Sequence, residues 1–501
     1  MINKRIIAKA IGGLLALEAA LMALCMVVAF YHNEPALHTW ALPITATLTT
    51  ALALYAYGKG AKSQFGRRDG YFVVGCTWII FSIFGMIPFL TSGSTQRLSV
   101  AFFETMSGFT TTGATAFSVI EALPHSILFW RSLTHWIGGM GIIFFTIAVL
   151  PTLGIGEQKV FAAEATGVKI GKLHPRISTT AHWLWSLYFL LTASCAGAYY
   201  LCGMSEWDAI NHALSTLATG GFSTHTDSIG WFHSATIEYV AILFMWLASV
   251  NFSLTYLMLV KRRFRQVFGN SELKAYICIN LGATLVFTVS YFCMYADFSR
   301  LDFSIDGLLT LCRMSEESVR NALFQAVSIQ TSTGFGKNDF MTWPPICWMT
   351  IIFISICGGC SGSTSGGIKV VRLVFVWKII SNEFTRILHP RALLPIRLSG
   401  ETVEESVVRS AVAYLLVYGI LVLLGTSAMV LLRLPLFDAV GLTITSLSNI
   451  GPAVGHHIGA MGSWDILSDT AIWIHSFLML AGRLEIFSLI LPFIPEFWRN
   501  R

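Results

Sequence analysis

Charged residues are scarce in this chain. Only 60 of its 501 residues are Asp, Glu, Lys or Arg, a share of 12% that is about half the usual one. Apolar residues make up 54% of the chain and include 36 Phe and 15 Trp. A chain of this composition cannot cover a folded core with polar surface, so soluble enzymes, nucleic-acid-binding proteins and disordered scaffolds are excluded.

The common signatures of catalytic and metal sites are also missing. The sequence contains neither HExxH nor GxSxG, and its His residues are dispersed. Ten Cys are scattered mostly in apolar runs, where a thiol behaves as a small hydrophobe, so they give no disulfide framework. Cys357 and Cys360 form one CxxC pair without a second pair or a nearby His, which argues against a zinc or redox site. We therefore expect no enzyme, and a polytopic membrane enzyme is the alternative from another class.

Long apolar runs are abundant instead. Runs of about 20 residues, long enough to cross a bilayer, recur along the chain, for example at 11–30, 184–201, 277–295 and 411–432. The sequence therefore predicts an all-α integral membrane protein in contact with the lipid bilayer.

Lys and Arg are unevenly distributed, and their positions predict the topology. Of 33 positive residues, 23 lie in six segments: 4–9, 59–68, 152–180, 261–274, 378–409 and 499–501. Segments between them, such as 31–40 and 203–233, contain none. Basic segments remain on the cytoplasmic side, so an even number of crossings separates successive ones. We predict both termini in the cytoplasm and about ten crossings.

A repeat follows the first two spans. Each of four outer segments contains an amphipathic stretch too short to cross (101–110, 209–218, 321–331, 437–448) and then a polar tripeptide ending in Gly. The closing glycines are separated by 108, 113 and 117 residues, which indicates one unit repeated four times. The tripeptides are Thr111-Thr112-Gly113, Thr219-Gly220-Gly221, Ser332-Thr333-Gly334 and Asn449-Ile450-Gly451. We expect two N-terminal transmembrane helices at 1–69 and helix-pore loop-helix units at 70–175, 176–270, 271–395 and 396–501.

The repeat predicts an ion pore. Extended backbone at membrane depth cannot face lipid, because its N–H and C=O groups lack partners there, but it can line a water-filled cavity. Rings of carbonyl oxygen replace the water that a cation sheds, and glycine permits the positive φ that aims carbonyls inward. We predict that the twelve tripeptide residues form a cation-binding selectivity filter around one pore. Any single loop of this kind is more typical of an ordinary turn, and the set of four at similar spacing favours the pore.

A glycine-rich break interrupts the third unit's return helix. Residues 357–367 contain five glycines and four hydroxyl residues, a composition with low helix propensity. A break that lines the cavity below the filter can act as a gate, whereas the alternative is a small-residue surface for helix packing. The gate residues we predict are Gly358, Gly359, Gly362, Gly366 and Gly367, together with Arg483.

Arg483 lies deep in the last apolar run, and a charge there faces the interior of the bundle or a cavity. We expect it below the filter as an electrostatic obstacle to the cation; the alternative is a structural arginine bonded to backbone carbonyls. Glu485 is two positions away and, on a continuous helix, points to another face. Glu104 has two possible roles, support of the filter from behind or attraction of cations at the mouth. The basic segments 261–274 and 378–397 are suited to anionic lipid or to an acidic soluble partner.

Four runs resemble those of a known family: 110–115, 218–224, 358–369 and 482–487. They are similar to TrkH-type subunits of the Trk/Ktr/HKT potassium-transporter superfamily, and the resemblance covers essentially the whole chain. It implies K⁺ uptake across the bacterial inner membrane, a homodimer with one pore in each subunit, and gating by the intramembrane loop. It also implies a cytosolic TrkA-type regulatory subunit that binds NAD(H) or ATP, with no nucleotide on this chain.

One position departs from the family pattern. Asn449 and Ile450 replace the hydroxyl-rich pair of the first repeat, so the fourfold symmetry is approximate and fewer ion sites are expected. The nearest alternative function is that of a Na⁺-permeable member of the same superfamily. By family analogy, glycine rather than serine at Gly113 favours K⁺.

Overall fold

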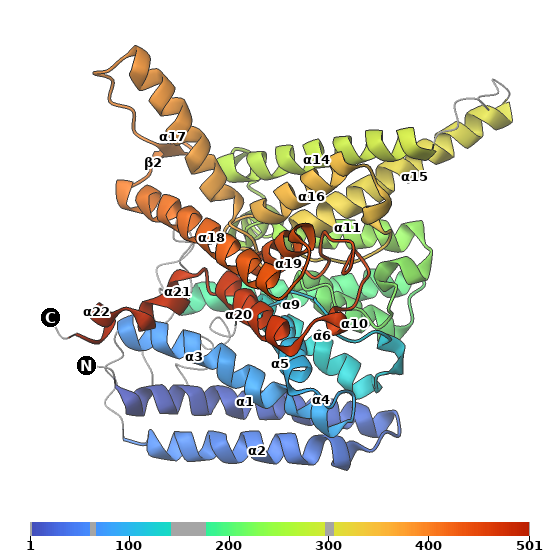
Figure 1. Ribbon diagram of the computed structural model, residues 1–501, viewed down its shortest axis with the longest axis vertical. Coiled ribbons are helices and arrows are strands. Elements are labelled where there is room, and N and C mark those ends of the chain that lie inside the picture. Colours follow the sequence, from blue (N-terminus) through green and yellow to red (C-terminus); the bar gives the residue numbers. More distant parts are fainter. Residues whose placement is uncertain (1–2, 61–66, 142–176, 296–304, 500–501) are drawn as a thin grey trace.

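The computed structural model describes residues 3–60, 67–141, 177–295 and 305–499. These residues are almost entirely helical, and the strands among them, β1 (Arg397–Leu398) and β2 (Glu401–Thr402), form one short antiparallel hairpin. Both termini lie at the same edge of the molecule (Figure 1). The all-α prediction is confirmed. Lys159, Lys169, Lys172 and Arg176, on which part of the topology prediction rests, lie outside the described residues.

The N-terminal pair consists of α1 (Lys4–Tyr31) and α2 (Ala36–Tyr57), which pack along each other. Most of α1 is apolar, and its buried face contacts both outer helices of the first unit. In Figure 1 the pair lies at one side of the molecule, beside α3. The pair is therefore an addition to the repeated part of the fold, as predicted.

The first two predicted units contain similar helices. The first comprises α3 (Arg67–Gly85), α4 (Ile87–Thr91), α5 (Leu98–Phe109), η1 (Ile120–Ala122) and α6 (His125–Gly139). The second comprises α9 (Ile177–Leu201), α10 (Glu206–Leu217), η2 (Ser228–Phe232), α11 (Ala235–Ser249), α12 (Phe252–Leu259) and α13 (Phe264–Phe268). In each unit a long helix, a short buried helix (α5, α10) and a return helix (α6, α11) follow one another.

The last two units follow the same order. The third comprises α14 (Ser271–Tyr295), α15 (Ile305–Gln330), η4 (Phe340–Thr342), α16 (Pro345–Cys357) and α17 (Val370–Leu388). The fourth comprises α18 (Glu405–Leu431), α19 (Leu436–Ser448), η5 (Trp464–Ile466), α20 (Asp469–Arg483), α21 (Phe487–Ile490), η6 (Leu491–Phe493) and α22 (Pro495–Trp498). Here α15 and α19 take the place of α5 and α10, and α16 and α20 are the return helices.

The four units close into a ring. Each return helix packs against the pore helix of the next unit: α6 on α10, α11 on α15, α16 on α19, and α20 on α5. The last of these contacts joins the fourth unit to the first. The helix contacts alone therefore arrange the four units around one axis.

Fewer helices than predicted are long and apolar enough to cross a membrane. Among the described residues, α1, α3–α4, α9, α14 and α18 are long and apolar enough to cross, and the bent pairs α11–α12 and α20–α21 bring the number to seven. The expected ten crossings require α2, α6 and α16 to cross as well. The number ten remains a prediction.

Two expectations about local structure were wrong. The third pore helix is not short, because α15 extends over 26 residues. Its N-terminal half contains no proline, and an exposed Glu316–Arg320 pair one turn apart supports it. The last apolar run is not a continuous helix either: α20 ends at Arg483, and Glu485 and Ile486 have positive φ values of 49° and 60°.

Candidate functional site

The four Gly-containing tripeptides meet around a single axis. The closing glycine of each segment approaches the backbone of the next segment so closely that no side chain fits between them. A Cβ added to Gly113 would lie 1.9 Å from the Gly220 carbonyl O, and one added to Gly221 would lie 2.0 Å from the Thr333 carbonyl O. A Cβ added to Gly334 would lie 3.1 Å from the Gly451 N, and one added to Gly451 would lie 2.6 Å from the Gly113 carbonyl O. The segments therefore contact one another in the order one, two, three, four and back to one.

The backbone of these segments has an unusual and repeated conformation. The first residue of every tripeptide has a positive φ: Thr111 54°, Thr219 53°, Ser332 58° and Asn449 55°. The closing glycines of the first three segments have φ values of 78°, 85° and 75°. Residues other than glycine seldom adopt this conformation, and strained backbone of this kind clusters at functional sites.

The fourth segment departs from the other three. Gly451 does not share the positive φ, and it precedes Pro452, which favours an extended conformation with negative φ in the residue before it. The Asn449 side chain also has its own partners: Nδ2 donates to Thr112 Oγ1 at 3.1 Å and to the Met479 carbonyl O at 2.8 Å. In place of a hydroxyl, this segment thus contributes an amide that links the fourth unit to the first.

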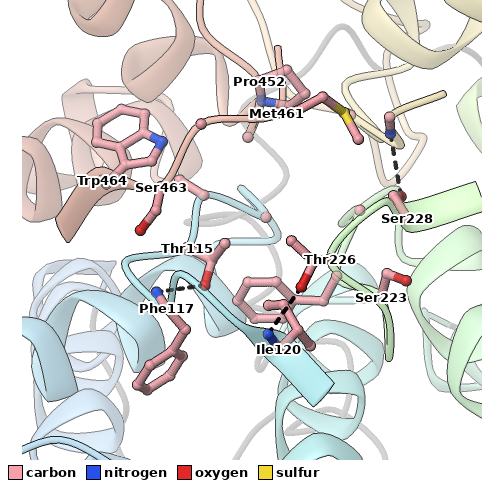
Figure 2. Close-up of a pocket in the computed structure, with 18 of the residues that line it drawn as sticks. Thr115, Phe117, Ile120, Ser223, Thr226, Ser228, Pro452, Met461, Ser463 and Trp464 are labelled. Atoms are coloured by element: carbon pink, nitrogen blue, oxygen red, sulfur yellow. Dashed lines mark hydrogen bonds between the residues drawn. The ribbon is translucent and has the colours of Figure 1, made fainter. Parts of the chain in front are cut away.

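A cavity of about 90 Å³ opens beside the ring, and all four closing glycines line it. Figure 2 shows Thr115, Phe117 and Ile120 of the first unit facing Met461 and Ser463 of the fourth. The lining residues include neither Asp nor Glu, so the oxygen atoms available to a cation are carbonyl and hydroxyl groups. A cation that binds there would exchange water for neutral oxygen ligands.

Glu104 supports the first segment from behind. Its side chain is completely buried, which excludes the alternative role at the mouth. Its carboxylate accepts hydrogen bonds from Thr115 Oγ1 at 2.7 Å and from the Ala116 amide at 2.5 Å, and it pairs with Arg131 Nε at 3.3 Å. The carboxylate therefore holds the chain that leaves the tripeptide.

Arg131, on α6, is a functional residue that the sequence analysis missed. It is 2% exposed, lies 4.0 Å from the centroid of the Phe222 ring and donates to the Ser223 carbonyl O at 3.4 Å. Its guanidinium thereby connects Glu104 of the first unit with the segment of the second. The available signal was a charged residue inside an apolar helix, which by default has a functional or structural partner.

Other pore helices support their loops in the same manner. Asp208 on α10 accepts from Thr224 Oγ1 at 2.7 Å, and Asp438 on α19 accepts from the His457 amide at 2.9 Å. In the third unit the Lys337 ammonium pairs with Glu238 at 2.6 Å. The loops are thus held by polar bonds in all four units.

The predicted break in the third return helix is present. Helix α16 ends at Cys357 and α17 begins at Val370, and Gly358, Gly362 and Gly367 between them have φ values of 66°, 71° and 75°. The break satisfies its backbone polar groups through other helices, as non-helical backbone in a membrane must.

This glycine loop, residues 358–367, lies against the ends of three pore helices. The Gly366 amide donates to Ser332 Oγ at 2.6 Å, and the Gly367 amide donates to the Ser448 carbonyl O at 3.1 Å. Thr364 Oγ1 donates to the Leu217 carbonyl O at 3.2 Å. The loop therefore bonds to the second, third and fourth units at the ends that lead into the tripeptides.

Arg483 joins the glycine loop to the first unit. Its guanidinium donates to the Thr364 carbonyl O at 2.9 Å, to the Gly139 carbonyl O at 3.1 Å, and to the Gly138 carbonyl O. Glu485, beyond the end of α20, instead forms an ion pair with Arg372 of α17. The Arg483 side chain thus forms the carbonyl hydrogen bonds of a structural arginine, and it also contacts the glycine loop.

Comparison with known proteins gives the family. The profile of the TrkH family, described as a cation transport protein, matches residues 42–500. The Trk system potassium uptake protein TrkH of Halomonas elongata is 34% identical over 99% of both chains, and that of Vibrio parahaemolyticus is 35% identical over 99% of both. The chain belongs to the TrkH family.

The structural comparison agrees with this assignment. The crystal structure of the potassium transporter TrkH from Vibrio parahaemolyticus superposes with a TM-score of 0.84, at 32% identity and 99% coverage of each chain. The predicted resemblance is thereby confirmed, and with it the prediction that this TrkH-family protein is a transporter and not an enzyme.

Removal of the Glu104 carboxylate should destabilise the fold more than any surface change. Glu104→Ala leaves the Arg131 guanidinium buried without this partner, and breaking a buried ion pair costs about 3–5 kcal/mol. Glu104→Gln retains the shape and the acceptor for the Ala116 amide, so we expect a smaller loss. Thermal unfolding of the purified variants in detergent measures both. An equal loss in the two variants would show that the charge does not matter.

Proposed function

We propose that this chain takes up K⁺ across the bacterial inner membrane, as the names of its relatives state for those proteins. The observation that carries the proposal is the closed ring of four tripeptides lined by neutral oxygen. The filter comprises Thr111, Thr112, Gly113, Thr219, Gly220, Gly221, Ser332, Thr333, Gly334, Asn449, Ile450 and Gly451. The membrane potential drives the ion inward with about 2.3 kcal/mol per charge for each 100 mV.

The gate in this proposal is the glycine loop with Arg483. The loop lies on the pore-helix ends, so K⁺ that leaves the filter meets it first. Its bonds to Ser332 and Ser448 break when the loop moves aside, and glycine at Gly358, Gly359, Gly362, Gly366 and Gly367 permits such a movement without side-chain collisions. The boundaries 1–69, 70–175, 176–270, 271–395 and 396–501 divide the chain into its two added helices and four pore units.

The partners in this proposal follow the resemblance to the Trk system. The chain forms a homodimer with one pore per subunit, both termini lie in the cytoplasm, and a cytosolic TrkA-type subunit carries the NAD(H) or ATP site. The position of both termini at one edge of the molecule is compatible with this orientation. K⁺ is the transported ion, and no nucleotide binds to this chain.

Ion competition in proteoliposomes tests the function. We expect the purified chain to take up Rb⁺ into K⁺-loaded vesicles, and external K⁺ to inhibit this uptake far more strongly than Na⁺, because carbonyl rings of this type favour the larger ion. Empty vesicles are the control. Equal inhibition by Na⁺ and K⁺ would favour the Na⁺-permeable alternative instead.

A further inference from the structure

A strongly basic surface segment follows α12. Lys261, Arg262, Arg263 and Arg265 are all exposed, and in the described part of the chain none forms an ion pair with an acid. Arg262, Arg263 and Arg265 line one shallow hollow at the surface. A concentration of positive charge that is not neutralised within the protein attracts an anionic partner.

Acidic side chains do not compensate this charge. Between residues 251 and 274 the one acid in the sequence is Glu272, which is fully buried and accepts a hydrogen bond from the Ser361 amide at 2.6 Å. By contrast, two arginines of α17 and α18 have acids beside them: Arg386 pairs with Glu383, and Arg409 lies 3.9 Å from Glu405. The segment 259–268 thus concentrates four basic residues without an acid that pairs with them among the described residues.

Large apolar side chains are exposed among these arginines. Phe264 and Phe268 are 52% and 54% exposed, and Leu259 and Val260, just before the basic run, are about half exposed. Val267 between the two phenylalanines is buried and fixes α13 to the protein. Arginines beside exposed phenyl rings are typical of segments that lie in the headgroup region of a bilayer.

The chain changes direction shortly before this segment. Helix α11 has 15 residues and spans about 22 Å, less than the apolar core of a bilayer. Helix α12 does not continue it but turns by 111°. The residues after α12 therefore follow a helix that runs sideways at the end of a membrane-embedded one.

We propose that residues 259–268 are a binding site for the phosphate headgroups of anionic phospholipids. The three arginines bind phosphate oxygens through their planar guanidinium groups, and Phe264 and Phe268 insert at the boundary of headgroups and acyl chains. An acidic soluble protein is the less suitable partner, because it would leave the phenyl rings exposed to water or require a matching apolar groove.

The site is connected to the glycine loop through α12. At the bend between α11 and α12, Asn251 Nδ2 donates to the Ser361 carbonyl O at 2.6 Å, and the Phe252 amide donates to the Gly362 carbonyl O at 3.0 Å. The Cys360 amide donates back to the Ser249 carbonyl O at 3.0 Å. Lipid that fixes the end of α12 therefore also restrains the glycine loop. An effect of this restraint on transport rests on the proposed role of the loop as the gate.

Lipid titration tests the site without any ion flux. The full-length protein in detergent is titrated with phosphatidylglycerol and with phosphatidylcholine, and bound lipid is counted by native mass spectrometry. We expect the variant with Arg262→Gln, Arg263→Gln and Arg265→Gln to bind phosphatidylglycerol about tenfold more weakly than the wild type, with no change for phosphatidylcholine. The charge-matched control with Arg386→Gln, Arg391→Gln and Arg409→Gln should bind as the wild type does.

Three results would overturn the site. They are equal phosphatidylglycerol binding by the triple variant and the wild type, equal losses in the control variant, and binding of free glycerol phosphate as tight as that of the lipid. If the triple variant lost affinity for an acidic soluble protein but not for phosphatidylglycerol, the surface would be a binding site for such a protein and not for lipid.

Hydrogen exchange tests the connection to the loop. In nanodiscs containing phosphatidylglycerol, the amides of Phe252 and Cys360 should exchange several-fold more slowly than in nanodiscs of phosphatidylcholine alone, because lipid holds the bend that these amides join. The triple variant should show the same exchange in both lipids. Identical exchange of the wild-type amides in both lipids would contradict the connection, whatever the protein transports.

Discussion

Gly113→Ala is expected to reduce Rb⁺ uptake into proteoliposomes to the level of empty vesicles. Two independent effects act at this position. The φ of 78° disfavours any residue with a Cβ, and the new methyl group would lie 1.9 Å from the Gly220 carbonyl O, far inside contact distance. That oxygen belongs to backbone and cannot rotate away as a side chain does. The ring must therefore open or its carbonyls must turn out of the pore.

A matched control separates strain from the collision. Gly93, in the loop before α5, has a φ of 74°, but no atom lies within 4 Å of an added Cβ. Gly93→Ala carries the same backbone penalty, about 1–2 kcal/mol, and should leave Rb⁺ uptake intact. If the two variants lost uptake equally, or if Gly113→Asp kept selectivity for Rb⁺ over Na⁺, the assignment of the filter would be wrong.

The arrangement of the four tripeptides could be predicted because its cause is local in each repeat. A half-length amphipathic stretch, a polar tripeptide and a closing glycine are visible in the sequence four times, and hydrocarbon excludes unpaired backbone groups. The close approach of Gly113, Gly221, Gly334 and Gly451 follows once the four copies surround one axis. The deviation at Asn449 and Ile450 could also be predicted, because those residue types differ from the other repeats.

The supports behind the filter were not predictable in the same way. Arg131 reaches Glu104 across 27 positions and Ser223 across 92, and neither distance corresponds to a helical spacing. The pair with Glu104 forms when α6 packs on α5, and the bond to Ser223 forms when α6 packs on the second unit through α10. The sequence indicated that a charge in α6 needs a partner, but it contained no information on which one.

The break after Arg483 has only a weak sequence signal, the single Gly482. Helix breaks normally contain glycine or proline, yet here the positive φ values belong to Glu485 and Ile486. Contacts with other helices supply the reason: Glu485 pairs with Arg372 of α17, and Ile486 is buried beside Tyr414 and Tyr418 of α18. Tertiary interactions thus override the helical preference of this apolar run, and they place Arg483 at a helix end rather than within a span.

Arg483→Ala is expected to increase Rb⁺ uptake, about tenfold or more. The guanidinium bonds to Thr364 of the glycine loop and to Gly138 and Gly139 of α6, so it ties the loop to the first unit. A hydrogen bond to a charged group contributes about 1.5–3 kcal/mol, and 1.4 kcal/mol corresponds to a factor of ten in an equilibrium. Loss of these bonds should shift the loop toward positions that leave the pore open, and loss of the positive charge lowers the barrier for K⁺ as well.

Two further substitutions separate the bonds from the charge. Arg483→Lys retains the charge but lacks the planar fork that reaches carbonyls on two sides, whereas Arg483→Gln removes the charge and keeps one amide donor. If the charge is the obstacle, the lysine variant stays as slow as the wild type and the glutamine variant becomes fast. If the bonds to the loop hold the gate, both variants become fast, because neither can bind Thr364 and Gly139 together. Unchanged uptake in the folded alanine variant would reduce Arg483 to a structural arginine and leave the glycine loop alone as the gate.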